Sequence, residues 1–243
     1  MPPIGTEPYH IISVVNGSTL VSDSVGEMMV DALNMILPIF CRDWNIKPIT
    51  VTYVAKGKEV ATPLCCILLD NSDVQDALGY HGQDNDVPYA RVFVKTILDY
   101  GGAFLYSSKG HTVAEIVAHE VLEMAVNLNV NVWWGLEDGS KLYAAEVCDP
   151  VQSNAVIVTV NDQPVRLSDW ILPAWSDPQD TKGPFNHNNT LKSPLTVDKG
   201  GYLIVMNGGK VYNVMGSEIS DYTKANMSTE RGLSKKKSVP EIK

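Results

Sequence analysis

The sequence predicts an α+β fold in which a mixed sheet packs on one buried helix. In residues 1–150, apolar segments of strand length mix with helical segments without the strict strand–helix alternation of a doubly wound sheet. After Pro150, apolar strands follow one another through tight turns. The 243 residues are 44% hydrophobic and 19% charged, which is the composition of a globular protein with a sizeable core.

The first elements are a strand over residues 10–15 and a long helix after it. Ser24, with Glu27 three residues later, has the spacing of a capping box and predicts where this helix begins. Pro38 has no amide hydrogen to donate, so we expect it to end or kink the helix.

The next segments are shorter and more varied. Residues 49–55 and 65–70 are rich in β-branched or apolar side chains and predict two strands. Residues 73–89 are polar and contain Gly and Pro, which favours a short helix followed by a long loop. Residues 91–98 alternate well enough for a strand, and residues 103–108 are expected to form a short extended piece.

The last third is expected to be β-rich. Residues 155–175 and 201–216 contain strands, and Asn207-Gly208-Gly209 has the composition of a hairpin turn. We therefore predict a domain over residues 1–150, a β-rich lobe over 151–220 packed on it, and an extended basic C-terminal arm over 221–243.

Charge and composition exclude several classes of protein. The net charge is −9, although residues 222–243 carry six Lys/Arg against two Glu, so nucleic acid is not an expected partner of the acidic body. No apolar run is long enough to span a bilayer, and the N-terminus lacks the pattern of a signal peptide. The cysteines have no CxxC spacing and are expected to be reduced and buried, with Cys65 and Cys66 on one strand.

Residues 112–128 predict a helix that is buried on nearly every side. Thr112 and Glu115 form a second capping box, so the helix should begin near residue 113. Glu115, His119 and Glu123 then lie on one stripe, with Glu120 on its flank, and apolar residues cover most of the remaining circumference.

Buried carboxylates require a cation, and residues 110–140 contain no Lys or Arg. His119 and Glu123, four residues apart, could bind one metal ion from the same helix face, and Glu120 could act as a general base toward water. This is the pattern of HExxH metal-dependent hydrolases with Glu123 in the place of the second histidine. The alternative is an exposed acidic stripe with His119 at its edge.

Glu146 and Asp149 extend the predicted site. They stand one helical turn apart in apolar surroundings before Pro150. We expect Glu146 to be the third metal ligand, and Asp149 to be either a fourth ligand or the group that orients His119. The alternative for Asp149 is a polar residue at a helix end before a proline.

Other polar side chains could serve a reaction at this site. A peptidase needs a donor for the tetrahedral oxyanion, and Tyr143, His111 and Arg166 are candidates. His81 and His187 are expected in loops, with no partner that the sequence identifies.

Four segments in this order, "YARVFVKTILDYGG", "AHEVLEMAVN", "EVCDPVQ" and "LSDWILPAW", resemble a family of zincin-like proteins encoded by tailed bacteriophages and prophages and often labelled virion or structural proteins. The resemblance covers roughly residues 5–215. It implies a metallopeptidase-like α+β domain, with the strand of residues 91–98 or the segment 103–108 beside the cleft. One departure is that family members often have Asp-Pro shortly after the HExxE helix, where this chain has Asn127 and Asn129.

Carried onto this chain, the resemblance implies zinc bound by His119, Glu123 and Glu146, with Glu120 as the general base. It gives two hypotheses: a structural virion protein made in the host cytoplasm, with peptidase activity left open, and a soluble zinc metallopeptidase. An anionic Glu123 weakens the acidification of water by the metal, which favours a slow enzyme or none. The expected partners are other virion proteins and copies of this chain, docked through the arm 222–243.

Four tryptophans suit an interface or a core: Trp133, Trp134, Trp170 and Trp175.

Overall fold

The computed structural model describes residues 11–60, 62–136 and 139–218. About 23% of the chain is helix and 32% is strand, and the larger sheet is mixed, so the predicted α+β class is confirmed. The predicted C-terminal arm and the first ten residues lie outside the described residues.

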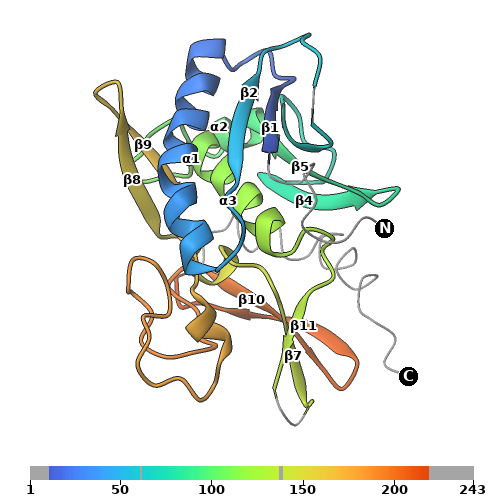
Figure 1. Cartoon of the computed structure of the whole chain (residues 1–243), viewed down its shortest axis with the longest axis vertical. Helices are drawn as coiled ribbons and strands as arrows, with labels where there is room; N and C mark the ends of the chain where they lie inside the picture. Colours follow the sequence, from blue (N-terminus) through green and yellow to red (C-terminus); the bar gives the residue numbers. More distant parts are fainter. Residues whose placement is uncertain (1–10, 61, 137–138, 219–243) are drawn as a thin grey trace.

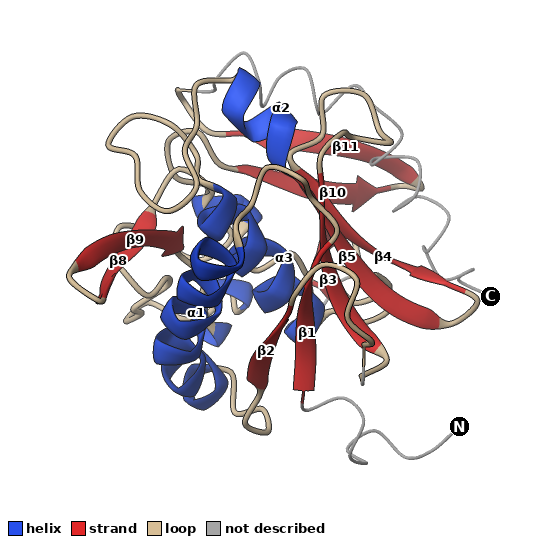
Figure 2. Ribbon diagram, turned by 90° about the horizontal axis from the view of Figure 1, so that it is seen from above, coloured by secondary structure: helices blue, strands red, loops and turns tan. Residues whose placement is uncertain are grey.

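The larger sheet has five strands in the order β2-β1-β3-β5-β4. Its members are β1 (Ile11–Asn16), β2 (Thr50–Val54), β3 (Leu64–Leu69), β4 (Gly79–Asp84) and β5 (Val87–Phe93). β2, β1, β3 and β5 run parallel, and β4 is an antiparallel edge strand paired with β5. Figure 2 shows the fan of these strands beside the helices.

The hairpin of β4 and β5 corrects the prediction of a helix and a long loop over residues 73–89. Asn85 and Asp86 both have positive φ, 48° and 65°, which is the backbone of a tight two-residue hairpin turn. Along β4, alternate residues are buried at its start, because one face of the strand packs on a helix. A polar composition therefore did not prevent strand formation here.

The cap of α1 (Asp23–Asp43) lies two residues before the predicted Ser24, because Ser22 caps the helix by accepting a hydrogen bond from the amide of Val25. The helix continues past Pro38 for five residues. Pro38 is exposed, whereas Phe40 and Cys41 after it are buried, so their packing offsets the missing hydrogen bond.

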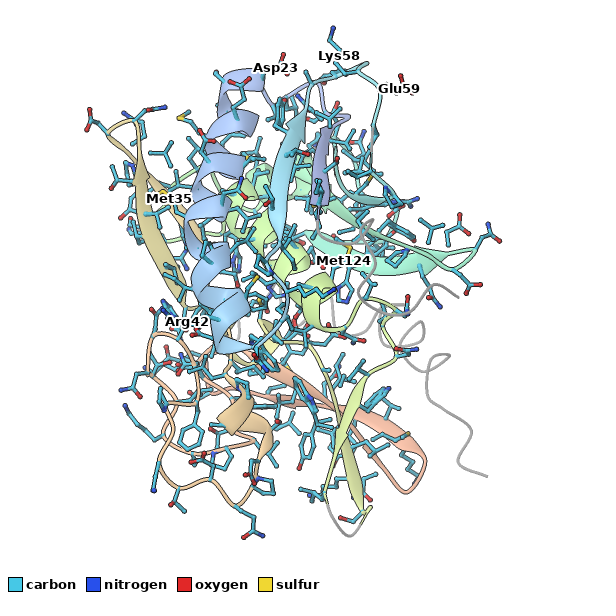
Figure 3. All side chains as sticks on the ribbon, in the orientation of Figure 1. Asp23, Met35, Arg42, Lys58, Glu59 and Met124 are labelled. Carbon is cyan, nitrogen blue, oxygen red and sulfur yellow. The ribbon has the colours of Figure 1, made fainter. Side chains whose placement is uncertain are left out.

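The charges at the two ends of α1 complement the helix dipole. Asp23 lies in the first turn and Arg42 in the last, at opposite ends of the helix in Figure 3. Among the described residues, α1 alone is long and apolar enough to cross a membrane by length and composition. Half of its most apolar window is buried inside the protein, as in the core helix of a globular domain.

Two further segments differ from the prediction. The strand expected over residues 91–98 ends at Phe93, and α2 (Val94–Asp99) follows it directly. Residues 103–108 form no strand. Ala103 makes an isolated β-bridge with Thr112. Side chains Val94 and Ile97 bury one face of α2, which explains an apolar pattern that also suits a strand.

α3 (Val113–Val126) runs through the centre of the molecule (Figure 1). It contacts β3, β4 and β5 on the sheet side, and α1 and β9 on the other side. All residues from Val113 to Met124 are buried, as the sequence predicts. The predicted capping box between Thr112 and Glu115 is present in both directions.

The remaining strands form a hairpin and a second sheet. The hairpin consists of β8 (Ala155–Val160) and β9 (Gln163–Ser168). The second sheet has the order β11-β10-β7-β6, from β6 (Trp133–Gly135), β7 (Lys141–Ala144), β10 (Tyr202–Asn207) and β11 (Lys210–Met215). Figure 1 places this sheet at the opposite end of the molecule from the start of α1.

The predicted boundary at residue 150 falls inside the short 3-10 helix Asp149–Val151. Backbone hydrogen bonds join β7 to β10 across that boundary, and β9 contacts α3. The division into a domain of residues 1–150 and a lobe of 151–220 therefore stays a prediction. Elements before and after residue 150 contact each other directly.

The tryptophans and cysteines mostly belong to the interior. Trp170 and Trp175 are fully buried, so their role is in the core and not at an exposed interface, while Trp133 and Trp134 are half-buried. The four cysteines are free thiols. Cys65 and Cys66 share β3, as predicted.

Candidate metal centre

The centre of the candidate site is one face of α3. Because Thr112 fixes the start of the helix, His119 and Glu123 fall one turn apart on the same stripe, and Glu120 lies next to them. These three side chains are 3%, 2% and 0% exposed. The alternative of an exposed acidic stripe is therefore excluded for this helix.

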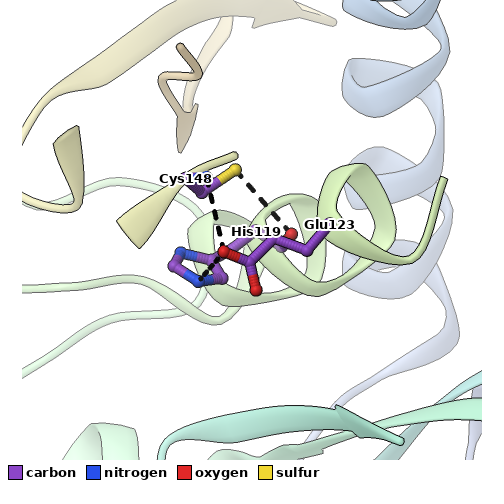
Figure 4. Close-up of side chains that lie close together, drawn as sticks. All are labelled: His119, Glu123 and Cys148. Atoms are coloured by element: carbon purple, nitrogen blue, oxygen red, sulfur yellow. Dashed lines mark hydrogen bonds and ion pairs between the residues drawn. The ribbon is translucent and has the colours of Figure 1, made fainter. Parts of the chain in front are cut away.

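His119 faces two carboxylates with its Nε2 atom. Glu123 Oε1 lies 3.3 Å from it and Asp149 Oδ1 lies 3.2 Å from it. Figure 4 shows the imidazole and the Glu123 carboxylate turned toward each other, with Cys148 beside them. The peptide nitrogen of Cys148 donates to Glu123 Oε1 at 3.3 Å, and its thiol donates to the carbonyl oxygen of His119 at 3.8 Å. The segment after β7 thus contacts the Glu123 side chain through Cys148 and the His119 ring through Asp149.

His81 is the site residue that the sequence did not identify. It lies on β4, is 6% exposed, and reaches across to α3. Its Nδ1 is 3.3 Å from Glu120 Oε2 and 3.4 Å from Glu123 Oε2, and its Nε2 is 3.6 Å from Glu146 Oε2. The prediction that His81 lies in a loop without a partner is wrong, because the hairpin of β4 and β5 carries it to the helix.

Glu146 and Asp149 both reach the cluster, as the sequence predicts, but they face different histidines. The contact of Glu146 is with His81, whereas that of Asp149 is with His119. Both carboxylates are nearly inaccessible to solvent, at 3% and 1% exposed. The six side chains therefore come from three separate parts of the chain: β4, α3 and residues 146–149.

Burial and mutual contact shift the pKa values of these groups. Burial raises the pKa of Glu123 to about 7, and the nearby Asp149 adds to the rise while His119 opposes it. Burial lowers the pKa of His119, but Glu123 and Asp149 outweigh it and bring that pKa well above its usual value. Burial by itself would lower the pKa of His81, but the nearby Glu146 and Glu120 outweigh it, so that this pKa is raised. Without a cation, the cluster holds protons at neutral pH that a bound ion would displace.

Glu115, on the same stripe of α3, has a different environment. Arg166 on β9 donates to its two oxygens at 2.9 and 3.2 Å, and His111 Nδ1 lies 3.4 Å away. Burial raises the pKa of Glu115, but His111 and Arg166 together leave it lowered. His111 and Arg166 were candidates for the oxyanion side, but both contact Glu115, and Arg166 also donates to the carbonyl oxygen of Ser153 at 3.1 Å. Tyr143, the third candidate, is half-buried on β7 between β6 and β10 and packs against the main core.

The donor atoms fit a divalent cation. Two groups of three side chains have ligand atoms within 4.8 Å of one another: His119, Glu123 and Cys148, and His81, Glu120 and Glu123. In a tetrahedral site with bonds of about 2.0–2.1 Å, neighbouring ligand atoms stand roughly 3.3–3.4 Å apart. The nitrogen–oxygen separations at His119 Nε2 and His81 Nδ1 match that value. The Nε2 atoms of His81 and His119 are both buried without a hydrogen bond. Nε2 of His119 faces the carboxylates of Glu123 and Asp149, where a metal ion could bind it.

Burial raises the pKa of the Cys148 thiol well above its usual value, so the thiol is neutral when no metal ion is bound. The peptide nitrogen of Cys148 orients the Glu123 carboxylate, and its thiol contacts the main-chain carbonyl of His119. The structure therefore provides buried His, Glu and Cys groups that could bind a metal ion.

Comparison with protein-family models, with curated protein sequences and with solved structures gave no match for this chain.

Proposed function

We propose that this chain is a structural protein of a tailed-phage virion, and that a zinc ion held by the buried cluster stabilises its fold. The resemblance of four ordered sequence segments to zincin-like phage proteins supports the phage part of this proposal. The geometry around α3 supports the structural part. A soluble zinc metallopeptidase is the competing function, because Glu120 stands next to His119 as in HExxH enzymes.

The contact of His81 with Glu120 is the observation that favours a structural role over a peptidase. A zinc hydrolase needs a general base that is free to take a proton from water. Here the side chain that would act as general base is engaged by His81 at 3.3 Å, and both are buried. This arrangement suits a metal that stabilises the fold better than one that activates water.

The residues that would hold zinc are His119, Glu123 and one carboxylate of the segment 146–149, with Asp149 placed against His119. When bound, zinc supplies two positive charges to a buried group of acids. The peptide nitrogen of Cys148 orients the Glu123 carboxylate, and Nδ1 of His81 contacts the Glu120 carboxylate. Zinc is preferred because it accepts mixed nitrogen and oxygen donors in a compact tetrahedral set.

Elemental analysis of the purified full chain tests the metal. We expect at least one zinc ion bound per chain, and a lower zinc content in His119→Ala. The matched control is His111→Ala, which removes a histidine outside the cluster and should leave zinc content unchanged. A protein that binds no divalent cation under any loading condition contradicts the proposal.

A peptide-library cleavage assay on the zinc-loaded protein tests the competing function. We expect no cleavage from the wild-type protein and no difference in Glu120→Gln. Cleavage that disappears in Glu120→Gln would replace the structural proposal with the metallopeptidase.

Mass spectrometry of purified phage particles from the host that carries this gene tests the virion assignment. We expect the chain at a fixed copy number per particle, in contact with other virion proteins or with copies of itself. Deletion of residues 222–243 should reduce incorporation if that arm is the docking segment. Absence of the chain from mature particles contradicts the assignment.

A further inference from the structure

The two oxygens of the Glu123 carboxylate face two different histidines. Oε1 lies 3.3 Å from His119 Nε2, and Oε2 lies 3.4 Å from His81 Nδ1. The histidines belong to different elements, α3 and β4, so the carboxylate of Glu123 stands between two separate nitrogen donors.

Each of these nitrogens also faces a second carboxylate. Asp149 Oδ1 is 3.2 Å from His119 Nε2, and Glu120 Oε2 is 3.3 Å from His81 Nδ1. Each half of the cluster therefore contains one imidazole nitrogen, one oxygen of Glu123 and one oxygen of another acid. All four nitrogen–oxygen separations fall near the roughly 3.3–3.4 Å expected between neighbouring ligands of one small divalent cation.

His81 faces acids with both ring nitrogens. Nδ1 lies within hydrogen-bond distance of Glu120 Oε2 and 3.4 Å from Glu123 Oε2, whereas Nε2 is buried without a hydrogen bond, 3.6 Å from Glu146 Oε2. An ion on the Nδ1 side would take the place of the proton between Nδ1 and the two carboxylates. The remaining N–H of the ring would then be on Nε2, the side of Glu146, as in many histidines that bind a metal.

We propose that the cluster binds two divalent cations that share the Glu123 carboxylate, one on the His119 and Asp149 side and one on the His81 and Glu120 side. This rests on the proposed metal-binding function and deepens it. Four carboxylates and two imidazoles from the described residues are a donor set of the size that carboxylate-bridged metal pairs use in helix bundles. Two divalent cations also match the formal charge of those four carboxylates.

Metal titration of the full chain measures the number of ions. The protein is first freed of metal with a chelator, and zinc binding is then followed by calorimetry together with elemental analysis. We expect two zinc ions per wild-type chain, one in His81→Ala and one in His119→Ala. His111→Ala serves as the histidine control and should retain two. If either alanine variant fails to fold by circular dichroism, His81→Gln or His119→Gln replaces it.

The stoichiometry separates this inference from the function on which it rests. One ion in the wild type, retained in His81→Ala, overturns the pair and leaves the single-ion proposal intact. No ion overturns both. Two ions in the wild type with one in each histidine variant support the pair.

Electron paramagnetic resonance of the manganese-loaded protein tests the shared carboxylate. Ions that share a ligand lie about 3.5–4 Å apart, close enough for their electron spins to couple. We expect an exchange-coupled spectrum in the wild type and an isolated Mn²⁺ spectrum in His81→Ala. Two uncoupled ions in the wild type would show that Glu123 does not bridge them, and would overturn the proposal.

Discussion

Gly79, at the start of β4, lets the edge strand lie directly against α3. A Cβ atom at this position would stand 2.7 Å from Ile116 Cγ2 and 3.0 Å from Glu120 Oε1. Real side chains essentially never approach that closely, so only glycine permits this packing distance. His81, two residues further along the same strand, reaches the cluster because of this close approach.

Gly79→Ala is expected to destabilise the protein by about 1–3 kcal/mol, the typical cost of overpacking a tight interior, and to weaken metal binding. Gly82→Ala on the same strand is the matched control, since its Cβ would meet Tyr89 at 3.6 Å, an ordinary contact. Urea denaturation and zinc titration of both variants provide the comparison. Equal stability of the two variants would contradict the close-packing explanation.

Two hairpins of this protein use the same dipeptide, and only one of them could be predicted from the sequence. Asn161 and Asp162 join β8 to β9 with φ values of 48° and 61°, nearly the conformation of Asn85 and Asp86 between β4 and β5. β8, which leads into the Asn161-Asp162 turn, is apolar apart from Thr159, so its sequence predicts a strand. β4 contains two glycines and polar residues, and its strand state depends on pairing with β5 and packing on α3.

The same difference explains which part of the candidate site could be predicted. His119, Glu120 and Glu123 lie within one helix whose cap and period are local features of the sequence, and Glu146 and Asp149 stand out as acids in an apolar segment. His81 is related to them only through the sheet. The signal that could have found it is the Asn-Asp turn, which places β4 antiparallel to β5 and therefore beside α3.

The ion pair of Glu115 and Arg166 joins α3 to β9. Arg166→Met is expected to destabilise the protein by about 3–5 kcal/mol at pH 7, because it leaves a charged carboxylate buried without its guanidinium. Lys95→Met, which removes an exposed pair with Asp99, is the control and should cost less than about 0.5 kcal/mol. Chemical denaturation measures both.

The pH dependence of this effect follows from the lowered pKa of Glu115. A carboxyl with a lowered folded-state pKa contributes stability above its unfolded value of about 4.3, and that stability is lost as the pH falls through the folded value. The difference between wild type and Arg166→Met should therefore be larger at pH 7 than at pH 4. A difference that is constant or grows toward pH 4 would mean that Arg166 acts through packing alone.

For the whole molecule, the cluster connects β4, α3 and the segment that leads from β7 to the C-terminal half. An ion that binds only the folded state at 100 times its dissociation constant adds about 2.7 kcal/mol of stability. For a chain of this length, that corresponds to roughly 5–10 °C in Tm. Chelation should lower Tm by this amount in the wild type and leave Tm unchanged in Glu123→Ala, as measured by differential scanning calorimetry. An equal Tm with and without the chelator in the wild type would mean that the cluster is not a stabilising metal site.

The spacing of the donors along the chain gives the ion a further consequence, for the unfolded state. His81 and Asp149 are 68 positions apart, so cations that tie them together through Glu123 act as a removable crosslink across a long loop. A covalent bridge over such a loop lowers the entropy of the unfolded chain by an amount worth about 4 kcal/mol. Because all four thiols are free, the stability of this protein would depend on the concentration of divalent cations and not on the redox state of its surroundings.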